Sequence, residues 1–174
     1  MTDRQPCEVT NLDRYGSAPL PWTRPHDLLH KGALGPEVPV FLGTAGAGGV
    51  PHAAGIGVAW LDGDLYLTSG PHTRKSRHLA SRPACTISIR LEGIDLVLEG
   101  EAAKVTEGGI LEQVAALYRA GGWPAEIEGE ALTAPYSAPS AGPPPWEVYR
   151  FTFHTAYGVA TTEPFGATRW KFSH

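Results

Sequence analysis

Short runs in which apolar and polar residues alternate dominate the chain and predict a β-rich fold. The alternation is clearest over 64–69, where Leu65 and Leu67 share a face, and over 84–90, where Ile87 and Ile89 do. We predict strands at 38–44, 50–61, 64–69, 84–90, 94–105, 147–160 and 167–172, the last of which is expected at an edge of the sheet. Asp62-Gly63 predicts a tight hairpin turn, and Gly100 predicts a bulge in its strand. Strands this short and numerous predict a mainly β fold, a six- to seven-stranded antiparallel barrel that is closed or nearly closed.

Helical spacing is confined to three short segments. The first is 22–32, with Thr23 as the expected N-cap and Pro25 in the first turn. The second follows Gly70-Pro71, has Thr73 as its N-cap and ends near Pro83. The third is 109–120, an amphipathic helix that the glycines at 121 and 122 end.

The chain has the length of one domain, 174 residues. We divide it into an N-terminal segment with a short helix (1–35), the barrel strands and helices (36–121), a long loop (122–145) and the C-terminal strands (146–174). The loop is rich in Pro, Ala, Gly and Ser without periodicity, and we predict that it covers a functional site.

Composition excludes several classes of protein. The chain is 42% hydrophobic, with 21 Gly, 16 Pro and a net charge of −4, which excludes a collagen or a disordered chain and gives no basic field for nucleic acid. Cys7 and Cys85 are far apart, without zinc-ligand spacing, so no metal site is expected. Neither a signal-peptide core nor a membrane-spanning apolar run is present, so we expect a cytoplasmic protein without a membrane partner.

Positive charge is concentrated at the N-terminal end of the helix that follows Gly70-Pro71, where it is unfavourable. Arg74, Lys75 and Arg77 lie in its first turn, where the helix dipole is already positive. A bound anion would offset this repulsion, because free N–H groups at a helix N-terminus bind phosphate. The hydroxyl groups of three nearby residues would complete such a cradle: Thr68, Ser69 and Thr73. The alternative is a solvated basic helix face.

Small residues follow one another along the strand at 50–61. The surface of this strand lacks large side chains because it contains Ala53, Ala54, Gly55, Gly57 and Ala59. Small residues in a strand often mark a place where a ligand approaches the backbone closely. Tight packing against the 22–32 helix is the alternative. The predicted anion-binding turn and the neighbouring strand of small residues together indicate a ligand with a flat heterocyclic ring that carries a phosphate.

The segments VPHAAGIGVAWLDGDLYLTSGPHTRKSRHL, IDLVLEGEAAKV and EPFGATRWKF resemble the pyridoxamine-phosphate-oxidase-like, FMN-binding split-barrel family. The resemblance covers 36–105 and, more loosely, the last strand. It implies a homodimer with FMN in the interface, and a small-molecule substrate.

By this resemblance Thr73, Arg74 and Lys75 match the phosphate-binding triplet, with Thr68 and Ser69 beside it. The backbone of Ala54, Gly55, Ile56, Gly57 and Val58 matches the strand that meets the ring, and Arg169 and Trp170 resemble a C-terminal pair that reaches the ring or substrate from the partner chain.

The resemblance implies a flavin-dependent oxidoreductase acting on an unidentified small molecule. The sequence departs from true pyridoxamine-phosphate oxidases, which place an arginine at Ala54 and a lysine near Val58 or Ala59. Two alternatives remain: a reductase that uses an 8-hydroxy deazaflavin, and a non-catalytic protein that binds flavin or haem. No residue is predicted as a catalytic acid or base. An apolar barrel with an accidental basic helix is the remaining possibility.

Overall fold

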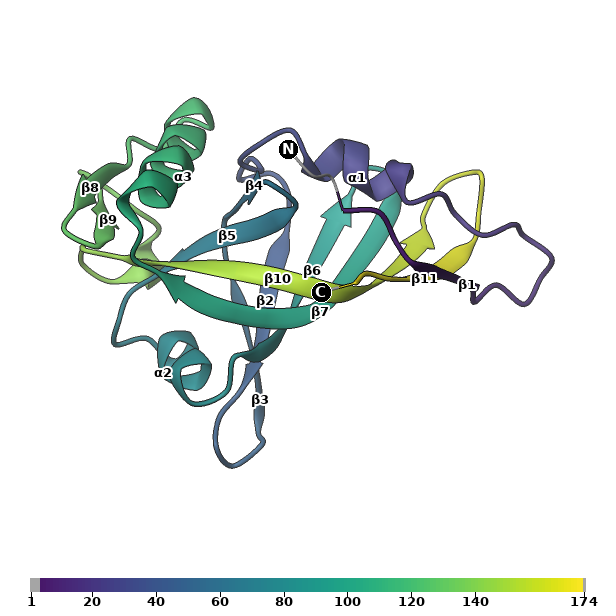
Figure 1. The fold of residues 1–174 in the computed structure, drawn as a ribbon, viewed down its shortest axis with the longest axis horizontal. Helices are drawn as coiled ribbons and strands as arrows, with labels where there is room; N and C mark the ends of the chain where they lie inside the picture. The colour runs from purple at the N-terminus through teal and green to yellow at the C-terminus, as the bar shows by residue number, and fades with distance from the viewer. Residues whose placement is uncertain (1–3, 174) are drawn as a thin grey trace.

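One curled antiparallel sheet forms the body of the protein, with helices at its margins (Figure 1). The computed structural model describes residues 4–173. The helices are α1 (Thr23–Leu29), α2 (Arg74–Ser81) and α3 (Gly108–Ala120). The strands are β1 (Glu8–Asn11), β2 (Val40–Ala45), β3 (Pro51–Gly55), β4 (Val58–Leu61), β5 (Asp64–Ser69), β6 (Ala84–Leu91), β7 (Ile94–Val105), β8 (Glu126–Glu128), β9 (Ala131–Thr133), β10 (Glu147–Ala160) and β11 (Ala167–Lys171).

The longest strand, β10, joins two parts of the sheet. The strand order is β1-β11-β10-β7-β6-β2-β3, and β5 also pairs with β10 and carries β4. The first part of β10 pairs with β5 from Glu147 to Phe151, and the last part pairs with β11 from Thr155 to Val159. Within residues 4–173 the sheet has nine strands, more than the six to seven predicted.

Two hydrophobic clusters lie on opposite faces of the sheet, because β4, β5 and the start of β10 give alternate residues to each. The larger cluster contains the fully buried Leu42, Ile87 and Leu98, the inward residues of the alternating strands. The smaller cluster packs one face of α3, through Leu111 and Val114, against β4 and β5. Alternation therefore sets which face of each strand points inward, as predicted for 84–90.

The predicted strand at 50–61 is wrong in one respect, because it is two strands. β3 pairs with β2, whereas β4 pairs with β5. The chain crosses between them at Ile56-Gly57, where the N–H of Ile56 donates to the carbonyl of Val40 at 3.0 Å. The Asp62-Gly63 turn that follows is confirmed, with φ of 51° and 89°, the left-handed values that such a turn requires.

The expected bulge lies opposite Gly100 rather than at it. The register of β7 and β10 shifts between Phe153 and Thr155, so the extra residue is His154 of β10. Gly100 is needed for a different reason, since a Cβ there would overlap the carbonyl oxygen of Thr152. The close approach of the bulged strand explains why this position has no side chain.

Three further predictions are corrected by pairings between distant parts of the chain. The N-terminal segment contributes β1, which pairs with β11, so 167–172 is not an edge strand. The 122–145 segment is not structureless, because it forms the β8–β9 hairpin and a 3-10 turn at Pro139–Ala141. Thr23 is not an N-cap: α1 is shorter than predicted, and its N-cap residue is Trp22 without a side-chain hydrogen bond.

Within the residues described, no helix combines the length and the apolar character needed to cross a membrane.

Candidate functional site

A network of hydroxyl groups holds the turn that leads from β5 into α2. The Oγ1 of Thr73 accepts the N–H of Ser76 at 3.3 Å, which confirms Thr73 as the N-cap. The Oγ atoms of Ser69 and Ser76 lie 2.7 Å apart, and Ser76 donates to the carbonyl of Gly70 at 2.8 Å. Ser69 and Ser76 are both buried, so these hydroxyls fix the turn rather than face solvent.

Cations without acidic partners surround this N-terminus. Among residues 4–173, neither Arg74 nor Lys75 makes an ion pair or a side-chain hydrogen bond. Lys75 is half-buried, and this burial lowers the pKa of its ammonium group. Arg77 donates to the carbonyl of His72 at 2.6 Å. The backbone N–H groups of the first turn add to the positive potential, because an α-helix leaves them without intrahelical partners.

His78 connects α2 to the β2–β3 hairpin, a grouping that the sequence did not indicate. Its Nδ1 lies 3.0 Å from the Oγ1 of Thr44, and its ring meets that of His52 edge-on at 5.8 Å. Desolvation, followed by the nearby His52, Arg74 and Arg77, lowers the pKa of His78. The only sequence signal was the i, i+4 spacing of Arg74 and His78, which puts both on adjacent turns of one side.

A hollow of about 650 Å³ opens beside this histidine pair, on the outer side of β2, β3, β6 and β7. Its lining includes Thr44, His52, Thr86, Glu99 and the bulge residue His154. Cys85 also borders it, but burial raises the pKa of that thiol to about 12, so it stays protonated at neutral pH. No group of three or more metal-ligating side chains occurs in the part of the chain that is described.

The small-residue segment presents open backbone at two positions. A Cβ added to Gly55 or to Gly57 would meet no described heavy atom within 4 Å. Ala54 is half-buried, and Ile56 packs on the main core. Val58 is fully buried in β4, opposite Leu67 of β5. Within one chain the predicted ring-binding segment is therefore open at Gly55 and Gly57 and closed at Val58.

Arg169 and Trp170 lie on β11, well away from α2 (Figure 1). The indole of Trp170 is fully buried against Trp22 and Gly158. Arg169 donates to Glu8 at 3.1 Å and to Thr10 at 3.0 Å on β1. These two predicted residues therefore do not join the α2 site within one chain.

The 122–145 segment reaches the turn before α2. A Cβ at Gly70 would lie 2.7 Å from the carbonyl oxygen of Ala141. The aromatic residues of the segment pack elsewhere: Trp123 meets Tyr118 of α3 at 5.2 Å and Trp146 at 5.5 Å. The segment thus flanks the site with backbone, while Trp123 packs on the smaller core and Tyr136 is exposed.

A family model described as pyridoxamine 5'-phosphate oxidase matches residues 30–160. No curated protein matches the sequence. The matched range includes β2 to β7, α2, α3 and β10, and thus the whole cation-lined turn.

Solved structures share the fold at low sequence identity. A putative 5-nitroimidazole antibiotic resistance protein from Bacteroides thetaiotaomicron is 12% identical, with a TM-score of 0.58, over 100% of this chain and 97% of the other. A NimC/NimA family protein from Clostridium acetobutylicum is 18% identical, with a TM-score of 0.53, over 84% and 88%. A protein named F420 reductase is 16% identical, with a TM-score of 0.51, over 80% and 98%. The predicted fold class, mainly β and of the split-barrel type, is confirmed.

Proposed function

We propose that this chain, which belongs to the pyridoxamine 5'-phosphate oxidase family, binds FMN at the N-terminus of α2 and acts as a flavin-dependent oxidoreductase on a small molecule. One observation carries the proposal: the α2 N-terminus gathers Arg74 and Lys75, and neither has an acidic partner among residues 4–173. Unpaired cations beside free helical N–H groups are costly unless an anion offsets them. The phosphate of FMN is such an anion.

The residues present fit a phosphate. Arg74 offers a planar fork of donors, Lys75 a point charge, and the first-turn N–H groups point outward along the helix axis. Thr73 and Ser69 would support the phosphate site indirectly, because their hydroxyls are engaged in hydrogen bonds that fix the turn. Thr68 precedes Ser69, the last residue of β5, and is half-exposed. The hydroxyl network therefore pre-organises the cradle, and the cations supply its affinity.

The flavin ring would lie against the backbone around Gly55 and Gly57, where no described side chain fills the space. When bound, FMN supplies the hydride or electron transfer, and the chain binds, orients and shields it. His52 and His78 lie between the cradle and the 650 Å³ hollow. Their position allows imidazole N–H groups to face the edge of a bound ring or of a substrate.

The departures from true pyridoxamine-phosphate oxidases argue against a phosphorylated vitamin B6 substrate. Val58 and Ala59, near which those enzymes have a lysine, are buried in the core, and Ala54 has no charge. A substrate without a phosphate group suits this chain better.

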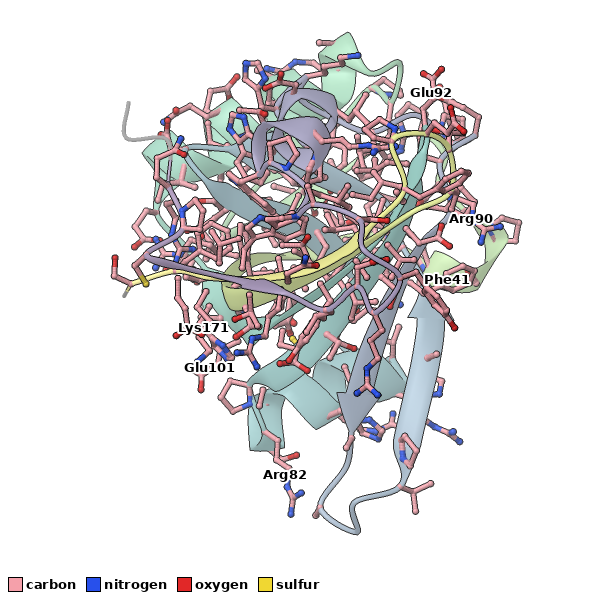
Figure 2. The ribbon with its side chains drawn as sticks, turned by 90° about the vertical axis from the view of Figure 1, so that its right-hand side faces the viewer. Phe41, Arg82, Arg90, Glu92, Glu101 and Lys171 are labelled. Atoms are coloured by element: carbon pink, nitrogen blue, oxygen red, sulfur yellow. The ribbon has the colours of Figure 1, made fainter. Side chains whose placement is uncertain are left out.

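A homodimer is part of the proposal. The outer face of the sheet exposes Phe41 by 50%, Val97 by 38% and Val159 by 53%. Phe41 pairs with Ser88, and Ser88 with Val97, so apolar and small side chains form one row across β2, β6 and β7. Figure 2 shows Phe41 and Arg90 pointing outward from this face. A second chain would cover this row and bring further residues to the ring.

A deazaflavin of the 8-hydroxy type is the second candidate cofactor. The structural match to the F420 reductase includes 80% of this chain. The open backbone at Gly55 and Gly57 leaves room for a longer molecule than FMN. A non-catalytic flavin or haem binder is the third possibility, since a heme binding protein from Mycobacterium smegmatis has the same fold, with a TM-score of 0.52.

The absorption spectrum of the purified protein and titration with FMN test the proposal. Wild-type protein is expected to bind FMN, and R74Q/K75Q to bind it at least about 100-fold more weakly, because two charge-assisted contacts of about 1.5–3 kcal/mol each are lost. R119Q is the matched control, since Arg119 is paired with Glu112 on α3, away from α2 and outside the row of Phe41, Ser88 and Val97.

Each alternative cofactor or role predicts a different result in these experiments. Preferential binding of the deazaflavin, with the same dependence on Arg74 and Lys75, would replace FMN by the second candidate. A haem spectrum would favour the third. Equal FMN affinity in wild type and R74Q/K75Q would refute the phosphate site itself. A protein that holds FMN but never exchanges electrons with any tested donor and acceptor would be a binder.

A further inference from the structure

A second hollow, of about 510 Å³, lies between α2, the end of β7 and the start of β10. We propose that it binds a small amphipathic anion, a carboxylate or sulfonate attached to an apolar ring or chain. Its apolar wall consists of Pro71, Leu79, Ala80, Pro83, Ala102 and Ala103. Its polar wall consists of Ser76, Arg77, Lys104, Glu147 and Tyr149.

This hollow is on the opposite flank of α2 from the proposed cofactor site. Successive residues of an α-helix are about 100° apart. Lys75 and His78 therefore share one flank, and His78 contacts Thr44 of β2 there. Arg77 and Ala80 share the other flank, which borders β7 and β10. A ligand in this hollow would not need the cradle at Lys75.

The polar wall is a pre-organised network rather than a set of mobile side chains. Glu147 accepts one hydrogen bond from the Nζ of Lys104 at 2.8 Å and another from the Oη of Tyr149 at 2.8 Å. Although burial opposes it, these contacts lower the pKa of Glu147, so the carboxylate stays ionised. Burial, together with Glu147, raises the pKa of Tyr149 to about 12, so its hydroxyl remains a donor.

The charge balance of the wall favours an anion. The carboxylate of Glu147 is neutralised by Lys104 at 2.8 Å, which leaves the positive charge of Arg77 in excess. No described carboxylate pairs with Arg77, whose Nη1 is held by the carbonyl of His72 at 2.6 Å. Arg77 lines the hollow, and the guanidinium donors that His72 does not engage have the fork geometry that suits a carboxylate or sulfonate.

The opposite wall selects for an apolar body on the same ligand. Leu79 and Ala102 are buried at the base of the hollow, while Ala80 and Ala103 are exposed on its rim. An apolar ring that covers these side chains removes their surface from water. The chemistry of the hollow therefore matches a molecule with one charged end and one apolar end.

Two fluorescent probes that differ only in charge test the proposal on the full chain. 8-Anilinonaphthalene-1-sulfonate carries the anion, and N-phenyl-1-naphthylamine has the same rings without it. The wild type is expected to bind the sulfonate at one saturable site, at least about tenfold more tightly than the neutral probe, because the charge-assisted contact is available only to the sulfonate. R77Q and K104Q are each expected to remove this preference. A80W is expected to block both probes by filling the hollow.

Control variants separate this site from the others. R74Q/K75Q is expected to keep the preference for the sulfonate, whether or not it still binds FMN, so a failure of the proposed function leaves this test intact. R119Q removes a charge on α3, outside both hollows, and is expected to behave as wild type. Circular dichroism and thermal unfolding confirm that each variant is folded. If the two probes bind equally to the wild type, or if folded R77Q, K104Q and A80W all bind the sulfonate as wild type does, the proposal is wrong.

Discussion

At the scale of single residues, the α2 turn separates groups that build the site from groups that present charge. The hydroxyls of Ser69, Thr73 and Ser76 are bonded to one another and to the carbonyl of Gly70. Arg74 and Lys75 make no such bond, and in the proposed function they bind the phosphate. Loss of a hydroxyl therefore disturbs the geometry of the turn, whereas loss of a cation changes affinity without unfolding the chain.

His78 gives the folded protein a dependence on pH. Its pKa is lowered from 6.5 by desolvation, His52, Arg74 and Arg77, so the folded chain takes up this proton less readily than the unfolded chain. The stability associated with neutral His78 is therefore present above pH 6.5 and is lost as the pH falls through the lowered pKa. We expect the free energy of unfolding of the wild type to drop more between pH 7.5 and pH 5.5 than that of H78Q. Urea denaturation at the two pH values measures the difference, and equal drops would contradict this role of His78.

At the scale of secondary-structure elements, α2 is short and depends on its cap. Thr73 satisfies the N–H of Ser76, one of the donors that an eight-residue helix otherwise leaves unpaired. Because Arg74 and Lys75 add charge of the unfavourable sign at the same end, no acidic side chain compensates for the loss of the cap.

The variant T73A measures the contribution of this cap. We expect it to reduce the free energy of unfolding by about 1 kcal/mol, the usual value for a lost threonine cap. T23A is the matched control, because Thr23 begins α1 but makes no capping hydrogen bond, and we expect a change of only a few tenths of a kcal/mol. Chemical denaturation followed by circular dichroism compares the two. Equal losses would mean that the hydroxyl network does not hold α2.

At the scale of the whole molecule, β10 organises the sheet, and the outer face carries the row that we propose as a dimer interface. β10 pairs with β5, β7 and β11, so it connects the two halves of the split barrel. The inner sides of the strands close over the larger apolar cluster, and α3 covers the smaller one, while Phe41, Val97 and Val159 face outward. The row of Phe41, Ser88 and Val97 is the surface that we propose a second chain covers.

We expect wild-type protein to sediment as a dimer and F41D to sediment as a monomer, since a carboxylate on the outer face cannot be buried against a second apolar surface without cost. V50D is the matched control, because Val50 is 72% exposed on the turn before β3 and lies outside the row. Sedimentation velocity at micromolar concentration distinguishes the species. A monomeric wild type, or a dimeric F41D, would refute this interface.

Local patterns were sufficient where neighbours along the chain decide the structure. Alternation at 84–90 predicted the inward Ile87 and Ile89, Asp62-Gly63 predicted a turn with positive φ, and Thr73 was predicted as a cap. Each depends on residues within a few positions of one another, so the sequence contains the whole signal.

The composition of the candidate site was only partly predictable. The cations and hydroxyls of α2 were visible because they are adjacent in sequence. The contact of His78 with Thr44, and its proximity to His52, depend on how α2 packs against β2 and β3. No periodicity in a single sequence reports the packing of two elements, so this part of the site was missed.

The sequence alone determined the β-rich class, the short basic helix with its cap, and the family to which the chain belongs. Tertiary structure decided which segments pair: it divided 50–61 between two neighbours, placed β1 against β11 and buried Trp170. The physical reason is that local conformation follows from steric and hydrogen-bonding preferences of adjacent residues, whereas strand pairing and burial depend on partners far away in the chain. The side of α2 that each residue faces was likewise decided by the sheet against which the helix packs.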